Sequence, residues 1–254
     1  MGIFDFLSKK SNPPAGGASS DKKVAGLAKV VADKRAQTYD RLDAIQSLAG
    51  MKSADAAAAL LRRFTFSIDP SITDQEEKDL AFRGIVDAGK DAVPAVVEFC
   101  LKAEALTWPL KVLREVLDEA DCRAELVRLL DRFDTEYARN VEPKQQLIVA
   151  LGDIKGDDVR IAVERFLEDV NETVRFHAVQ TIFSQDNEAS VPALVKMLPA
   201  EESVRVKNKV AEGLMGRGWT VPAELRGSAN QALQDSNGFS VGPDGKLRKG
   251  AGYG

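Results

Sequence analysis

The sequence predicts an all-α protein built as an α-solenoid, in which about six helical hairpins and a terminal capping helix stack into a superhelix. Three observations lead to this prediction. Apolar residues recur at helical spacing along most of the 254 residues. The same two-helix pattern returns every 31 to 37 residues, a period typical of repeat proteins. Aromatic residues make up only 6% of the chain, as expected for helices that pack closely through Leu, Val and Ala.

Residues 169–198 show the repeated unit most clearly. Val174, Ala178 and Ile182 fall on one face of a first helix. A polar break at residues 184–188 precedes a second apolar face over residues 191–198. One hairpin of this size cannot bury its own apolar faces, whereas a stack of hairpins can.

Each copy of this unit has an apolar anchor at the position of Ile182 and a small or aliphatic residue four positions earlier. The anchors in chain order are Leu48, Ile85, Val116, Leu151, Ile182 and Leu214. A Val-Pro-Ala triplet follows three of them, at residues 93–95, 191–193 and 221–223. Proline is tolerated in the first turn of a helix, where its missing N–H costs little. We therefore expect each triplet to begin the second helix of its hairpin.

The remaining helices are predicted from the same spacing, starting at residue 23. They span residues 23–32, 39–48, 54–66, 74–88, 91–103, 106–117, 122–130, 145–154, 157–166, 204–214 and 222–233. Longer turns at residues 67–73 and 133–143 account for the two largest spacings between anchors. Residues 23–234 are therefore predicted to form one solenoid domain.

The central unit resembles the HEAT repeat, in the short bacterial form that also occurs in phycobilisome-lyase subunits. The resemblance rests on Asp169, Val174, Arg175, Ala178 and Ile182, followed by Val191-Pro192-Ala193-Leu194 and Leu198. It covers roughly residues 23–234 and implies a right-handed superhelix, but it specifies little about function. The copy around Val116 departs from the pattern, because Pro109 replaces the basic residue that the family favours.

The two ends of the chain differ in composition from the repeats. Residues 1–22 contain an apolar decamer, with Ile3, Phe4, Phe6 and Leu7 ahead of Lys9 and Lys10, and then a flexible linker rich in Pro, Gly and Ser. The decamer either docks on a partner or a membrane surface, or folds back on the first repeat or stays disordered. Residues 235–254 are glycine-rich and predict a flexible tail, with a small hairpin around residues 242–245 as the alternative.

A basic residue stands seven positions before five of the six anchors. This basic row consists of Arg41, Lys78, Lys144, Arg175 and Lys207. In one interpretation the row lines the concave side of the superhelix and binds an acidic peptide or protein surface. In the other it is structural, since HEAT repeats commonly pair this position with an acidic residue six positions earlier. Asp169 and Glu201 keep that spacing, whereas Lys78 and Lys144 lack such a carboxylate and are expected to carry free charges.

The sequence contains no recognisable catalytic, cofactor-binding or metal-binding constellation. His177 is the only histidine, so a histidine-based metal site would lack further ligands, and we expect it to be exposed on its helix. A net charge of −4 argues against general nucleic-acid binding. No apolar run is long enough to span a membrane, and because the N-terminal residues lack a basic leader followed by an apolar run, we expect no secretory signal. Cys100 and Cys122 are predicted to be buried free thiols in a cytoplasmic protein.

The function expected from these observations is that of a non-catalytic, cytoplasmic scaffold or adaptor that binds other proteins. The first alternative is an accessory subunit of an enzyme, resembling the HEAT-like bilin lyases. The last is a HEAT-like DNA glycosylase, which the acidic balance of the chain disfavours. Neither alternative has catalytic residues that can be identified in the sequence.

Overall fold

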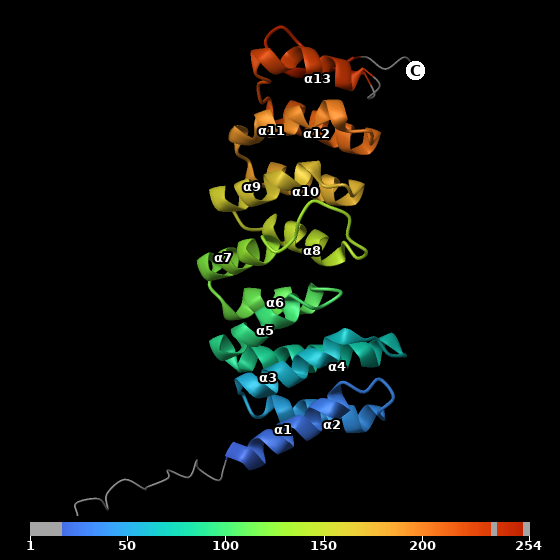
Figure 1. The fold of residues 1–254 in the computed structure, drawn as a ribbon, viewed down its shortest axis with the longest axis vertical. Helices are drawn as coiled ribbons and strands as arrows, with labels where there is room; N and C mark the ends of the chain where they lie inside the picture. The colour runs from blue at the N-terminus through green and yellow to red at the C-terminus, as the bar shows by residue number, and fades with distance from the viewer. Residues whose placement is uncertain (1–16, 235–237, 251–254) are drawn as a thin grey trace, which may run out of the picture. The chain divides into compact units, whose positions relative to one another are not determined.

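The computed structural model describes residues 17–234 and 238–250, and the regular structure of these residues is almost entirely helical (Figure 1). They contain 13 α-helices, six short 3-10 turns and one two-stranded sheet. The all-α fold class is therefore confirmed. The chain forms two compact units, one ending at Val96 and the other beginning at Val97. The apolar residues of the N-terminal decamer lie outside the described residues.

The first unit is built from four helices and the start of a fifth. These are α1 (Gly17–Val31), α2 (Thr38–Ala49), α3 (Ala54–Leu60), α4 (Ser71–Asp87) and α5 (Val93–Cys100), with the 3-10 turns η1 (Leu61–Thr65) and η2 (Gly89–Ala92). Helix α2 packs against α1, α3 and α4, and α3 also contacts α1 and α4. Helix α1 begins six residues before the predicted start at residue 23, so the end of the predicted linker is helical.

The second unit continues with helices that pack in sequence order (Figure 1). Its helices are α6 (Thr107–Val116), α7 (Glu119–Leu130), α8 (Glu142–Leu151), α9 (Asp157–Glu164), α10 (Glu172–Gln185), α11 (Val191–Lys196), α12 (Val204–Arg217) and α13 (Arg226–Leu233). The 3-10 turns are η3 (Arg165–Glu168), η4 (Glu188–Ser190), η5 (Leu198–Ala200) and η6 (Ala223–Leu225). Helix α8 contacts α6, α7 and α10, and α10 contacts α8, α9 and α12. Helices α8, α10 and α12 therefore pack side by side in chain order, and α7 and α9 pack against each other beside α8 and α10.

The apolar positions predicted from the repeats lie in the core. Five anchors have 0% exposed surface: Leu48, Ile85, Leu151, Ile182 and Leu214. Val116 is half-buried, in the copy that departs from the pattern. All six residues four positions before the anchors are buried. Two Val-Pro-Ala triplets begin α5 and α11, and the third leads into η6 and α13. The apolar register is therefore confirmed for five of the six copies, and two of the three triplets begin a helix as predicted.

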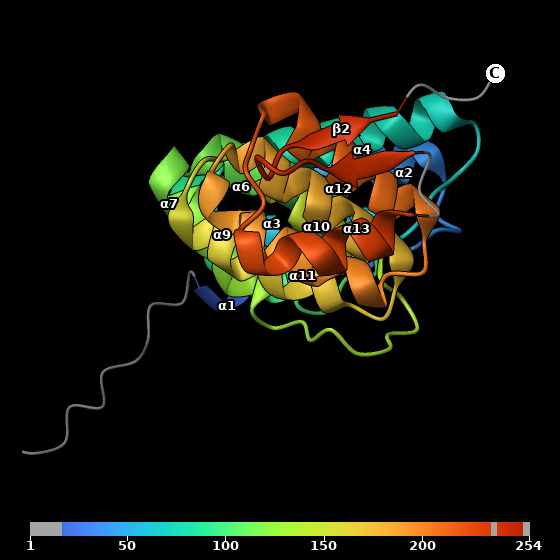
Figure 2. The same cartoon turned by 90° about the horizontal axis from the view of Figure 1, so that it is seen from above.

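The C-terminal segment forms a hairpin, and our prediction of a flexible tail is wrong for its described part. Strands β1 (Phe239–Val241) and β2 (Leu247–Lys249) pair in an antiparallel manner. The hairpin lies beside α12 and α13 (Figure 2). Its buried side chains are Phe239, Val241 and Leu247. The Val241 N–H donates to Asn230 Oδ1 on α13 at 2.6 Å. Three buried apolar residues are enough to hold the hairpin on the last helices, despite its glycine-rich sequence.

Candidate functional site

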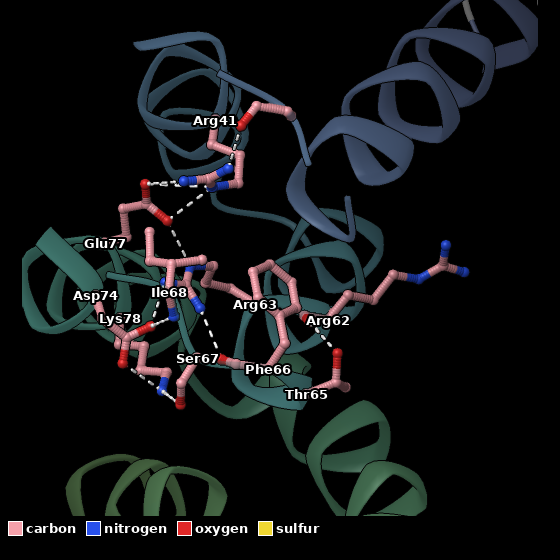
Figure 3. Close-up of polar contacts among 11 residues, drawn as sticks. Arg41, Arg62, Arg63, Thr65, Phe66, Ser67, Ile68, Asp74, Glu77 and Lys78 are labelled. Atoms are coloured by element: carbon pink, nitrogen blue, oxygen red, sulfur yellow. Dashed lines mark hydrogen bonds and ion pairs between the residues drawn. The ribbon is translucent and has the colours of Figure 1, made fainter. Parts of the chain in front are cut away.

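Arg41 and Lys78, the first two members of the basic row, belong to a buried network of charges in the first unit (Figure 3). At its centre, Glu77 pairs with Arg41 Nη2 at 2.9 Å and with Arg63 Nε at 2.6 Å. The Glu77 and Arg63 side chains have no exposed surface, and that of Arg41 has 2%. Asp74 pairs with Arg63 at 2.6 Å and with Lys78 at 2.7 Å. These cations are therefore satisfied inside the unit.

The environment of Asp74 favours its ionised form. Burial alone would raise its pKa, but hydrogen bonds from Lys78, Arg63 and the Ile68 N–H outweigh burial and lower the pKa of Asp74. The Lys78 ammonium also contacts Ser67 Oγ at 3.2 Å. The expectation that Lys78 carries a free charge is therefore wrong, because its partner lies four positions earlier in α4 rather than six.

Lys144 and Arg175, the next two members, form an ion-pair ladder in the second unit. Lys144 Nζ on α8 lies 2.5 Å from Asp169 Oδ2, and Arg175 Nε on α10 lies 2.7 Å from Glu201 Oε2. Asp169 lies three residues before the start of α10, and Glu201 lies three residues before the start of α12. The Asp169 carboxylate accepts a hydrogen bond from the Asn171 N–H, and the Glu201 carboxylate accepts one from the Ser203 N–H. The ladder differs from our expectation in two ways. Each basic side chain pairs with the acidic residue of the following repeat, and Lys144 is not free.

The basic row therefore does not form one exposed binding surface. Arg41, Lys78 and Lys144 are buried, and Arg175 is half-buried. Lys207 is half-buried on α12, and no carboxylate within the described ranges lies within salt-bridge distance of it. The other predicted contact residues, Ile3, Phe4, Phe6 and Leu7, lie outside the described residues.

A groove of about 680 Å³ lies in the second unit between α6, the loop at residues 131–141, α8 and α10. Its volume is within the usual range for ligand sites, about 300–1,000 Å³. Leu110 and Val149 make part of the lining apolar, and Val149 is 48% exposed. The charged and titratable lining residues are Lys111, Arg114, Arg139, Glu142, Asp153 and His177. Three cations thus face two carboxylates, which leaves the groove slightly positive.

Two side chains, Arg114 and Gln146, hold α6 against α8 at the groove. Arg114 Nη2 donates to the Ala150 carbonyl at 2.6 Å and to Asp153 Oδ2 at 2.8 Å. Gln146 Nε2 donates to Thr107 Oγ1 at 3.1 Å. The Gln146 Oε1 atom accepts a hydrogen bond from the Leu106 N–H, directly before α6. These side chains line the groove but are already used in holding its walls.

The loop at residues 131–141 forms another wall and is anchored at several points. Asn140 Nδ2 donates to the Glu104 carbonyl at 2.8 Å. The Thr135 carbonyl accepts a hydrogen bond from the Val170 N–H, just before α10, at 3.0 Å. Lys144 Nζ donates to the Asp134 carbonyl at 2.9 Å. Lys144, which we predicted to contact a partner, thus positions a wall of the groove.

Lys111, Arg139 and His177 are the lining groups least committed to the fold. Lys111 and Arg139 are exposed, and no described carboxylate lies within salt-bridge distance of either. Lys111 Nζ lies 4.7 Å from the centre of the Trp108 ring. His177 is half-buried rather than exposed, and among the described residues its Nδ1 has no hydrogen-bond partner. Burial and the nearby Arg205 lower the pKa of His177.

The groove combines two available cations with apolar surface, an arrangement suited to an extended segment that carries both carboxylates and an apolar side chain. In the described ranges, no group of three or more His, Cys, Asp or Glu is placed to hold a metal ion. Cys100 and Cys122 are buried free thiols, and burial raises the pKa of Cys100 to about 12.

The groove itself was not predicted from the sequence. Its cations Lys111, Arg114 and Arg139 occupy ordinary polar positions of α6 and of the loop. They do not recur at a fixed distance before the anchors, as the members of the basic row do. Two signals were present: the lengthened turn at residues 133–143, and Val149 on the polar side of an amphipathic helix. The lengthened turn and the exposed Val149 indicate a groove only once the structure places α6, α8 and α10 next to one another.

No protein-family model and no curated protein sequence matches the chain. Among solved structures, one chain from work described as "Computational Design of Self-Assembling Cyclic Protein Homooligomers" is 14% identical, over 87% of this chain and 79% of that chain. The TM-score of 0.16 is too low to indicate a shared fold. In the part of the chain that is described, none of the helices is long and apolar enough to cross a bilayer.

Proposed function

We propose that the protein is a non-catalytic scaffold of HEAT-like repeats arranged as a solenoid, and that the groove between α6, α8 and α10 binds an acidic segment of a partner protein. The groove carries this proposal, because Lys111 and Arg139 flank apolar surface without an ion partner among the described residues. The repeated burial of the anchors and the Lys144 and Arg175 ladder support the HEAT-like assignment. Two free thiols fit a cytoplasmic location.

The expected affinity is modest and sensitive to salt. Exposed ion pairs typically contribute about 0.2–1 kcal/mol each, so Lys111 and Arg139 alone cannot hold a partner. Val149 is already about half covered, with 48% of its surface exposed, so covering the rest adds roughly 0.7–1.5 kcal/mol before ordering costs. Charge then steers the encounter and selects acidic segments, and added salt weakens that selection.

The test compares partner capture by the native chain with capture by the double variant Lys111→Glu/Arg139→Glu. Capture from cells that express the protein naturally, followed by mass spectrometry, should recover a partner with an acidic segment, and the groove variant should lose it. The control Lys196→Glu/Lys246→Glu makes the same change in charge at two exposed lysines outside the groove. It should retain the partner.

A synthetic peptide of the captured acidic segment provides the direct measurement. His177 is the only histidine, so its imidazole signals in an NMR titration report on the groove. Carboxylates placed nearby stabilise the imidazolium ion, so the depressed pKa of His177 should rise when the peptide binds. Equal peptide affinity in the native chain and the groove variant, or binding without any change at His177, would contradict the proposal.

A further inference from the structure

A second groove, of about 410 Å³, lies in the first unit between α1 and α3. Both helices line it with residues at the same i, i+3, i+4, i+7 spacing. Helix α1 contributes Asp21, Val24, Ala25 and Ala28, and α3 with the turn after it contributes Asp55, Ala58, Ala59 and Arg62. Residues at this spacing share one face of a helix, so the groove follows two turns of both helices.

The groove has small apolar side chains along its length and opposite charges at its two ends. Helices α1 and α3 are joined to α2 by connections of six and four residues (32–37 and 50–53). Such short connections join antiparallel neighbours, so α1 and α3 run in the same direction (Figure 1). Asp21 and Asp55 therefore lie at one end of the groove, and Arg62 lies towards the other. Ala25 and Ala58 are exposed between them, beside a half-buried Val24.

We propose that residues 1–10 of the same chain dock into this groove and cover α1 and α3. The decamer carries four large apolar side chains, at Ile3, Phe4, Phe6 and Leu7. Alanines leave room for large side chains, and the groove presents four of them with a valine. This inference rests on the first unit alone and does not depend on the function proposed for the groove of the second unit.

The distribution of charge selects both the occupant and its direction. Residues 11–16 link Lys10 to the start of α1 and can span at most about 20 Å. A connection of this length is long enough for the decamer to return alongside α1 in the opposite direction, as short connections between antiparallel neighbours do. Lys9 and Lys10 then meet Asp21 and Asp55, while Asp5 lies towards Arg62. The reverse direction would place like charges together at both ends.

Docking in this way shields the apolar decamer from other surfaces. A partner protein or a membrane that recruits Ile3, Phe4, Phe6 and Leu7 would have to displace them from the groove between α1 and α3. The segment would then act as a self-contact that competes with recruitment. The fraction of molecules in which residues 1–10 occupy the groove can be measured without knowing any external partner.

A nitroxide attached to the full chain at Ser8→Cys tests the proposal by paramagnetic broadening. Cys100 and Cys122 are each 2% exposed, and burial raises the pKa of both thiols, so the label should react at residue 8. The parent chain treated in the same way is the control for labelling. With alanine methyl groups labelled by carbon-13, we expect the signals of Ala25, Ala58 and Ala59 to lose most of their intensity, and to recover it when the nitroxide is reduced.

Charge reversal tests the direction of docking. Asp55→Lys alone and Lys9→Glu/Lys10→Glu alone should each weaken the broadening, and the three changes together should restore it. Asp43→Lys is the matched control, because Asp43 is an exposed aspartate on α2 that does not line the groove. It should leave the broadening unchanged.

Three results would overturn the proposal. Broadening in a mixture of nitroxide-bearing chains and separate isotope-labelled chains would assign the groove to a second copy. An absence of broadening in every sample would show that the decamer does not occupy the groove. Broadening that persists unchanged in all the charge variants would exclude the register given by Lys9, Lys10 and Asp55.

Discussion

Glu77 is the residue on which the buried charges of the first unit depend. Its carboxylate has no exposed surface and accepts hydrogen bonds from both Arg41 and Arg63. A buried charge is tolerated only when it is paired and hydrogen-bonded. Removing the charge of Glu77 would therefore leave two guanidinium groups in the interior with one fewer anion between them.

We expect Glu77→Gln to lower the free energy of unfolding by about 3–5 kcal/mol, the usual cost of breaking a buried ion pair. Glu76→Gln is the matched control, because Glu76 is the preceding residue and is exposed. Its effect should stay within about 0.5 kcal/mol. Denaturant unfolding of both variants measures the difference. Similar small effects for the two would show that Glu77 does not stabilise the network.

The partners of the basic row could not be predicted from residue spacing alone. The sequence shows which positions are basic, and resemblance to HEAT repeats suggests an acidic partner nearby in the chain. In the structure, the carboxylate partners of Arg41 and Lys144 lie 36 and 25 residues away. These distances along the chain are set by how one hairpin stacks on the next, which single-sequence periodicity does not contain.

At the scale of elements, the contact between α10 and α12 depends on a glycine inside a helix. A Cβ atom added to Gly213 would lie 2.2 Å from Cε2 of Phe183, so no larger residue fits without movement of the ring or of a helix. Glycine in a helix interior costs about 1 kcal/mol relative to alanine. That cost is offset here by the close approach of the two helices.

Gly213→Ala should therefore destabilise the second unit by about 1–3 kcal/mol, the typical cost of overpacking. Gly216→Ala, one turn later in α12, has nothing within 4 Å of the added Cβ. It should stabilise the protein by about 0.4–1 kcal/mol, since alanine restricts the unfolded chain. Thermal melts of the two variants under the same buffer conditions should shift in opposite directions. Melts that shift upward in both would mean that α10 and α12 do not approach closely at Gly213.

At the scale of the whole molecule, the repeat pattern was predictable and the groove was not. Anchors such as Ile182 and Leu214 follow from local apolar periodicity, which one sequence contains in full. The groove brings Lys111, Arg139 and His177 together from three separate stretches, and nothing local links them. The C-terminal hairpin was only the alternative prediction for a related reason, because Phe239 and Leu247 are buried by α12 and α13 rather than by their own strand pattern.

The proposed repeat architecture makes a prediction about how a local defect spreads. In repeat arrays each hairpin contacts only its neighbours, so stability is close to a sum of local and nearest-neighbour terms. Glu77→Gln should therefore speed amide hydrogen exchange in α2 and α4, which carry Arg41 and Glu77, and leave α10 and α12 unchanged. Gly213→Ala should give the opposite pattern, with faster exchange in α10 and α12 only.

Hydrogen exchange followed by mass spectrometry measures both variants against the native chain, peptide by peptide, in native buffer where exchange reports local opening. Gly216→Ala serves as the control in the second unit, because it changes the same helix without a clash and should not speed exchange anywhere. If either Glu77→Gln or Gly213→Ala accelerates exchange equally in α2, α4, α10 and α12, then opening is global. The chain would then unfold as one cooperative body, and the nearest-neighbour behaviour expected of a repeat scaffold would be contradicted.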